Sequence, residues 1–160
     1  MTTNENCPLC RQPGGPVLWR NDAFRVVQVD DADYPGYTRV IWNRHVAEMT
    51  LLSPAERREL MDAVWLVEQA QRNVLRPDKV NLAQFGNMVP HLHWHIIPRW
   101  RGDSRFPEAV WAPPATRDVA EQERWCLQAD GLAKRLPDYH AAVVAGFECL
   151  GSDPIRGLTP

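Results

Sequence analysis

Hydrophobic and polar positions alternate most regularly over residues 92–97, where Leu92, Trp94 and Ile96 are separated by histidines. An alternation with a period of two is typical of a β-strand, because successive side chains point to opposite faces of the sheet. The strand is therefore predicted to bury its apolar side and to present its histidines on the other. Three further strands are predicted over residues 24–29, 38–42 and 80–85.

A long helix is predicted to begin at Ser53. This serine can serve as an N-cap, Pro54 suits the first helical position, and Glu56 completes a capping box. Apolar residues then recur at helical spacing until Pro77 closes the segment; they are Leu60, Met61, Val64, Val67, Val74 and Leu75. Strands around one long helix indicate an α+β domain with an antiparallel sheet.

The last third of the chain is less regular. A second helix is predicted over residues 118–136, although Gly131 weakens that prediction. Residues 137–160 are ambiguous, and 141–145 fit either a short helix or a strand.

Length and composition indicate one globular domain, with 160 residues of which 44% are hydrophobic and 24% charged. The net charge of −2 supplies no basic field for nucleic acid. No apolar segment approaches the ~20 residues of a membrane span. The first six residues lack the features of a signal peptide. We expect a cytoplasmic protein that binds neither nucleic acid nor membrane.

His91, His93 and His95 fall on one face of the last predicted strand. Imidazole acts as base, nucleophile or metal ligand near neutral pH. A strand that rises roughly 3.3 Å per residue separates the outer two Cα atoms by about 13 Å, so one ion reaches all three rings only if the strand bends strongly. Divided roles are favoured. The alternatives are a two-histidine metal site completed from other strands, a metal-binding surface strand, or chance spacing.

The segment His-Leu-His-Trp-His-Ile-Ile at 91–97, continued by Pro98 and Arg99, resembles the signature of the histidine triad (HIT) superfamily of nucleotide hydrolases and transferases. The resemblance extends over roughly residues 7 to 111. It implies a HIT-like α+β fold with an antiparallel sheet of about five strands, one long helix and a C-terminal helix. Residues 1–115 would form the HIT domain, 116–160 a helical extension and tail of the same domain, and the protein would be a homodimer.

The resemblance also implies roles for the three histidines. His93 would attack the α-phosphorus of a nucleotide and form a covalent nucleotidyl-histidine, which water or another acceptor then resolves. His95 would face the phosphate oxygens and stabilise developing charge, and His91 would complete the catalytic triad. No catalytic metal is required.

The segment before the triad departs from the family at one position. Gly86 and Val89 match, and Asn87 can replace the family's glutamine as an amide donor. Met88 stands where family members carry a hydroxyl that hydrogen-bonds the leaving group, and a thioether cannot take that role. This departure leaves the protonation of the leaving group, and the substrate class, open.

Three more residues are candidates for binding the nucleotide. Asn81 is a candidate phosphate or ribose contact, Phe24 a candidate for the apolar slot of the base, and Asp30 a candidate for the ribose hydroxyls. Each has an ordinary structural alternative: an edge-strand polar residue, a core residue and a solvated loop acid.

Cys7 and Cys10 form a Cys-x-x-Cys pair, which alone fits a zinc knuckle, a redox pair or neither. In a redox motif a strand usually precedes the cysteine pair, and no strand is predicted before Cys7. The resemblance supplies two more ligands, His45 and His91, because some bacterial HIT proteins bind zinc through such a set. Four protein ligands would make the zinc structural, since they leave no open position. The alternative is a vestigial site with reduced cysteines.

We therefore expect a nucleotide phosphoramidase or dinucleoside polyphosphate hydrolase that acts on a purine nucleotide or nucleotide conjugate. Two alternatives remain: a nucleotidyl transferase with an unknown acceptor, and a zinc-stabilised nucleotide-binding module with little turnover.

Overall fold

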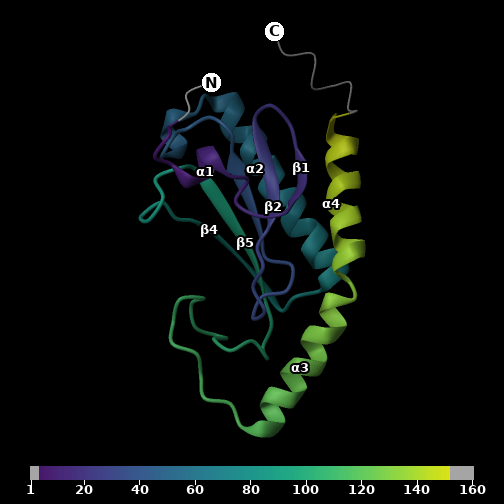
Figure 1. Cartoon of the computed structure of the whole chain (residues 1–160). Helices are drawn as coiled ribbons and strands as arrows, with labels where there is room; N and C mark the ends of the chain where they lie inside the picture. Colours follow the sequence, from purple (N-terminus) through teal and green to yellow (C-terminus); the bar gives the residue numbers. More distant parts are fainter. Residues whose placement is uncertain (1–3, 152–160) are drawn as a thin grey trace.

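The computed structural model describes residues 4–151 and contains one five-stranded sheet with helices (Figure 1). Neighbouring strands are antiparallel, in the order β1-β2-β3-β5-β4. The strands are β1 (Val17–Arg20), β2 (Phe24–Gln28), β3 (Thr38–Trp42), β4 (Lys79–Gln84) and β5 (His93–Arg99). The predicted α+β fold with about five antiparallel strands is thus confirmed. The strand that the pattern missed is β1, whose four residues are too few to establish a period.

The long helix is α2 (Pro54–Ala70), and it begins as predicted. The Ser53 side chain accepts from the backbone N–H of Glu56, and the Glu56 carboxylate accepts from the backbone N–H of Ser53. A π-helical turn, η2 (Gln71–Leu75), continues the helix. Two short elements lie earlier in the chain, α1 (Pro8–Arg11) and the 3-10 turn η1 (Met49–Leu51).

Helix α2 covers one face of the sheet. On β5 and just before it, Leu92 and Ile96 are fully buried and Trp94 packs against the same core. They meet the apolar stripe of α2, which includes Leu60, Val64 and Val67. The alternation in the sequence therefore separates a core face from a face free for chemistry.

A buried polar cluster fixes the start of β3. The Gln71 amide donates to the carbonyl oxygens of Gly36 and Ile96, both at 3.0 Å. The hydroxyl of Thr38 lies 2.7 Å from that of Tyr139. Because buried polar groups need partners, these bonds hold β3 in one position relative to β5 and the helices.

The C-terminal third contains two helices, α3 (Val119–Ala133) and α4 (Leu136–Gly151). The helix predicted over 118–136 corresponds to α3, and residues 141–145, which the sequence left open between helix and strand, lie within α4. Pro137 does not end the first helix but stands in the first turn of the second, a position that proline favours. Tyr139, Val143 and Phe147 recur at a spacing of four and are buried. The predictions for residues 152–160 lie outside the described residues.

Helix α4 packs on α2 and on β1. The ring of Phe147 stacks on that of Trp19, with 4.4 Å between centroids, and also contacts Phe24. The extension is thus part of the core that supports the sheet. Within residues 4–151, no helix combines the length and apolar character that crossing a membrane requires.

Candidate active site

A cavity of about 890 Å³ lies on the sheet face that the core leaves free. Its floor carries His93 and His95 of β5 and Arg39 of β3. Residues 85–89 form one wall, parts of the N-terminal segment 8–14 form another, and residues 110 and 111 close one end. This volume lies within the range of small-molecule sites.

His93 is held in one tautomer. Its Nδ1 lies 2.5 Å from the carbonyl oxygen of His91. A carbonyl only accepts, so Nδ1 must carry the proton and Nε2 must keep its lone pair. Within residues 4–151, Nε2 has no hydrogen-bond partner, and the ring lines the cavity. Burial chiefly, and also the charge of Arg39, lowers the pKa of His93, which favours the neutral ring that a nucleophile requires.

His95 is held in the complementary tautomer. Its Nδ1 is hydrogen-bonded to the hydroxyl of Tyr37. Burial raises the pKa of this tyrosine, so its proton stays in place. Since the Tyr37 hydroxyl has no other acceptor among the described residues, it donates to Nδ1, and the His95 proton sits on Nε2. That Nε2 is buried without a partner. Burial, followed by His93 and Arg39, lowers the pKa of His95 to about 3.

The cavity therefore presents two neighbouring imidazoles with opposite hydrogen-bonding character. The ring centroids of His93 and His95 are 4.8 Å apart. One Nε2 offers a lone pair and the other offers a proton. This pair suits attack on an electrophile whose attached oxygen becomes more negative during the reaction.

The ring of His91 belongs to a different site from the rings of His93 and His95. Its ring does not line the cavity but joins Cys7, Cys10 and His45, whose candidate ligand atoms lie within 4.8 Å of one another. Both cysteines are free thiols. Arg25 supports the N-terminal segment by donating to the carbonyl oxygen of Leu9 at 2.5 Å. Among the described residues, His91 contributes to the cavity through its carbonyl oxygen, which orients His93.

The donor set fits a tetrahedral zinc ion. Zinc bonds of about 2.3 Å to sulfur and 2.0–2.1 Å to nitrogen produce donor separations of roughly 3.3–3.8 Å. The Nδ1 atoms of His45 and His91 are 3.3 Å apart, and Nδ1 of His91 lies 3.4 Å from the Cys7 sulfur and 3.6 Å from the Cys10 sulfur. Nε2 of His91 lies 2.6 Å from the Trp42 carbonyl oxygen, so its proton is there and Nδ1 is free to bind metal.

The loop before the triad borders the cavity. Gly86, Asn87 and Val89 all line the cavity, with Met88 among them. The Met88 side chain is 93% exposed, so it offers neither a hydrogen bond nor close packing at the bottom of the cavity.

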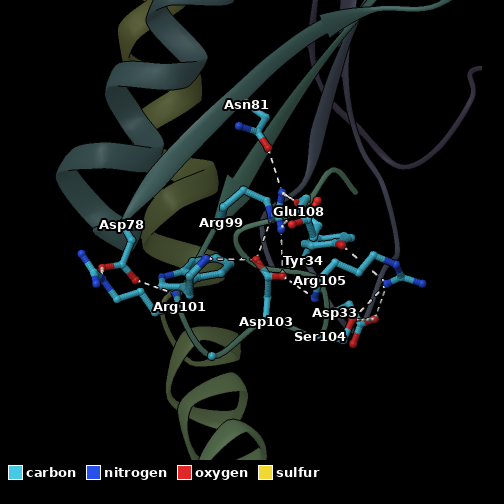
Figure 2. A network of polar contacts seen from close by, with 12 residues as sticks. Asp33, Tyr34, Asp78, Asn81, Arg99, Arg101, Asp103, Ser104, Arg105 and Glu108 are labelled. Atoms are coloured by element: carbon cyan, nitrogen blue, oxygen red, sulfur yellow. Dashed lines mark hydrogen bonds and ion pairs between the residues drawn. The ribbon is translucent and has the colours of Figure 1, made fainter. Parts of the chain in front are cut away.

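Asn81 lies beside the cavity rather than in it. Its Oδ1 accepts from Nη1 of Arg99 at 2.9 Å, and its side chain faces a neighbouring hollow (Figure 2). Arg99 also forms a buried ion pair with Asp103 at 2.7 Å and donates to the carbonyl oxygen of Glu108. This network holds the loop after β5 against the sheet (Figure 2). Trp111, which follows this loop, lines the cavity.

Phe24 and Asp30 do not line the cavity. Phe24 is buried in the helix-facing core, because the alternation of β2 turns it away from the histidine face. Asp30 is exposed and faces a separate surface hollow, whereas its neighbour Asp31 lines the cavity. The structure thus places Phe24 in the core and brings Asp31, the neighbour of Asp30, to the cavity.

The cavity residues that the sequence reasoning missed include Tyr37, Arg39 and Asp31. A charged residue inside the apolar segment 38–42 was the available signal for Arg39, since arginine is rarely placed in a strand without a partner or a task. No local pattern pointed to Tyr37, because its role is the hydrogen bond to His95, a residue 58 positions away in the sequence.

The chain is similar to known proteins over this region. A family model of the HIT domain matches residues 14–102. Over 78 residues the chain is 35% identical to AP-4-A phosphorylase of Mycobacterium tuberculosis, a match that covers 45% of this chain and 40% of that protein. Over 83 residues it is 35% identical to asymmetrical bis(5'-nucleosyl)-tetraphosphatase of Schizosaccharomyces pombe, covering 49% and 46% respectively. The match thus spans less than half the length of these curated relatives.

Solved structures share the architecture. A histidine triad protein from Bradyrhizobium japonicum superposes with a TM-score of 0.58 and 28% identity, over 77% of this chain and 91% of that one. The likeness therefore extends beyond the residues that the family model matches.

Proposed function

The chain belongs to the HIT domain family, and from this we propose that it is a nucleotide hydrolase or transferase that acts at the α-phosphate through a covalent nucleotidyl-histidine. The observation that supports this proposal most strongly is the tautomer of His93. The hydrogen bond to the His91 carbonyl leaves the lone pair on Nε2 of His93, which lies in the cavity next to the protonated Nε2 of His95. The names of the two curated relatives support chemistry on dinucleoside polyphosphates.

The reaction proceeds in two displacements. The lone pair on Nε2 of His93 attacks the α-phosphorus, the bond from phosphorus to the leaving group breaks, and the leaving group takes that electron pair. The Nε2 proton of His95 is donated as a hydrogen bond to an α-phosphate oxygen as its charge grows. In the second step an acceptor oxygen attacks phosphorus, the phosphorus–nitrogen bond breaks, and its electron pair returns to His93. The acceptor's proton is lost to solvent.

The acceptor distinguishes a hydrolase from a transferase. Water yields a nucleoside monophosphate, whereas inorganic phosphate yields a nucleoside diphosphate. One relative is named a phosphorylase and the other a tetraphosphatase, so the assay is run with and without inorganic phosphate. Phosphate-dependent formation of ADP from diadenosine tetraphosphate would identify a transferase.

Nucleotide contacts are proposed from the cavity lining. Gly86, Asn87 and Val89 would present the loop to the phosphates, as the resemblance implies. Asp31 would accept hydrogen bonds from the ribose hydroxyls, in place of Asp30. The purine preference, the homodimer and the cytoplasmic location stay predictions.

We propose that Cys7, Cys10, His45 and His91 bind a structural zinc ion, supported by the tetrahedral donor separations. Bound zinc would tie the N-terminal segment to the residue that orients His93. No step of the reaction passes through it.

The decisive experiment searches for the covalent intermediate. The protein is mixed with diadenosine tetraphosphate or adenosine 5'-phosphoramidate, quenched, digested and analysed by mass spectrometry. We expect an adenylyl group on the peptide that contains His93, absent in His93→Ala. Turnover by wild type without any adduct, together with turnover by His93→Ala, would contradict the covalent mechanism. Nucleotide binding without turnover would instead favour a binding module.

A further inference from the structure

We propose, on the basis of the function proposed above, that Arg39 binds the phosphate chain of the substrate beyond the α-phosphate. Arg39 thereby makes the cavity selective for nucleotides whose leaving group is itself a phosphate anion. Arg39 is a binding residue in this role and takes no part in bond making.

The position of Arg39 places its charge beside the reacting group. It is the direct antiparallel partner of His95 in the pairing of β3 with β5. Directly paired residues in antiparallel strands have Cα atoms about 4.5–5.5 Å apart, so their side chains rise side by side from the sheet. Its guanidinium lies over the ring of Tyr37, 5.6 Å from the centroid, and Tyr37 in turn holds His95.

The guanidinium has unused donors. Nε of Arg39 is buried without a partner, and Arg39 forms no ion pair within residues 4–151. Asp31 is the one carboxylate among the described residues that line the cavity. It does not pair with Arg39 and instead accepts a hydrogen bond from the backbone N–H of Asp33 at 3.0 Å. Buried polar groups without partners are uncommon, and a ligand is one way of satisfying them.

Other arginines of the sheet show what a structural guanidinium does here. Arg25 on the adjacent strand donates to the carbonyl oxygens of Leu9 and Pro13 and to the Asn43 side chain. Arg99 is paired with Asp103 and donates to further oxygens. Both have their charge or donors committed to the protein. Arg39 differs because its charge faces the cavity that His93 and His95 line, and its Nε has no partner among the described residues.

The chemistry of the leaving group then decides the substrate class. A departing polyphosphate carries negative charge, and a planar guanidinium stabilises it through paired N–H bonds. A departing amine must gain a proton instead, and the exposed thioether of Met88 cannot supply one. The positive charge of Arg39 stabilises a phosphate leaving group, and the loop offers no proton to an amine. The cavity therefore favours nucleotides linked to phosphate over nucleotides linked to nitrogen.

The test measures binding, so it does not depend on turnover. Isothermal titration calorimetry compares AMP with α,β-methylene-ATP, which keeps the chain but cannot be cleaved at the α-phosphate. We expect wild type to bind the methylene compound at least tenfold more tightly than AMP. Arg39→Gln should reduce that preference to about twofold or less, and Arg39→Lys should retain part of it. Arg101→Gln, which removes an exposed arginine paired with Asp78, is the matched control.

Each result bears on one proposal or both. An equal loss of affinity for AMP and the methylene compound in Arg39→Gln would overturn the assignment, because Arg39 would then serve the α-phosphate, the base or the fold. So would a wild type without preference for the chain. If the preference depends on Arg39 but no adduct forms on His93, the proposed function fails and the phosphate subsite stands. If neither nucleotide binds, both fail.

Discussion

The cavity and the Cys-His cluster draw on the same short run of histidines, but they differ in where their donor atoms point. In the cluster, Nδ1 of His91 faces three other donors, and its Nε2 is satisfied by the protein. In the cavity, His93 and His95 each have one nitrogen held by the protein and the other without a partner among the described residues. A closed donor set suits a structural ion, whereas unpartnered nitrogens suit a reactant that arrives from outside.

The two regions meet at the His91 peptide group and at Pro8 and Leu9, which lie between the two cysteines and line the cavity. The His91 ring belongs to the cluster, and its carbonyl oxygen orients His93. The difference between the cavity and the cluster therefore leads to two expectations. Damage to the cavity should leave the metal and the fold intact, and damage to the cluster should reduce stability first and activity as a consequence.

Removing the nucleophile should have the largest effect. His93→Ala is expected to lower turnover by about 10⁴-fold or more, because the covalent route is lost. Nucleotide affinity should stay within about tenfold, and zinc content and melting temperature should be unchanged. His140→Ala, on α4 and outside both sites, is the matched control. A variant rate near that of wild type would end the covalent mechanism.

Removing a cluster ligand should act on stability. Cys7→Ser is expected to lose the one zinc per chain and to lower the melting temperature by about 10 °C, which corresponds to roughly 3 kcal/mol, since metal binding and folding are linked. Elemental analysis and thermal denaturation measure both. Cys126→Ser, an exposed cysteine outside the cluster, should change neither. Metal-free wild type from a chelator-free, reducing purification would refute the zinc site.

Removing the hydroxyl that orients His95 should have an intermediate effect. Tyr37→Phe is expected to reduce turnover by about 10- to 100-fold, because the Nε2 proton of His95 is no longer enforced. Nitrogen NMR of the imidazoles should report the Nε2–H tautomer of His95 in wild type and a mixture in the variant. A rate loss with an unchanged tautomer would assign Tyr37 a packing role instead.

Adding a hydroxyl at the rim should have a smaller, substrate-dependent effect. Met88→Ser is expected to raise activity on amine-linked adenylates by about tenfold and to leave dinucleoside polyphosphates within about twofold, since only the amine needs a proton. Leu127→Ser, on the exposed side of α3, is the control. Equal gains on both substrates would show that Met88 affects access only.

The smallest effect is expected on stability at mildly acidic pH. Burial lowers the pKa of His95 from 6.5 to about 3, so between these values the unfolded chain binds the proton more strongly than the folded protein. Stability is therefore expected to fall as the pH falls below 6.5, by at most about 1.4 kcal/mol per pH unit from this group. Denaturant unfolding of wild type and His95→Gln at equal zinc should show a shallower fall in the variant. Parallel curves would exclude His95 as the cause.

Local sequence accounts for much of the fold. The alternation over 92–97 separates a buried face from a chemical one, and the Ser53 capping box starts α2 at the predicted residue. Both signals act within a few residues, where backbone geometry alone decides. The four cluster ligands came from a family pattern, and the structure brings them together.

The remaining features depend on residues far apart in the chain. The pairing of β3 with β5 sets Arg39 opposite His95 and brings the hydroxyl of Tyr37 to its ring, although 58 residues separate the two. The fold also determines that Asp31, rather than Asp30, lines the cavity and that Phe24 packs in the core. A periodic pattern specifies which face a side chain takes, but strand register and helix packing specify its neighbours. The sequence by itself thus indicated four of the five strands, helix α2 and the histidine face of β5. Tertiary structure alone decided which proton each histidine carries and which charge lies beside it.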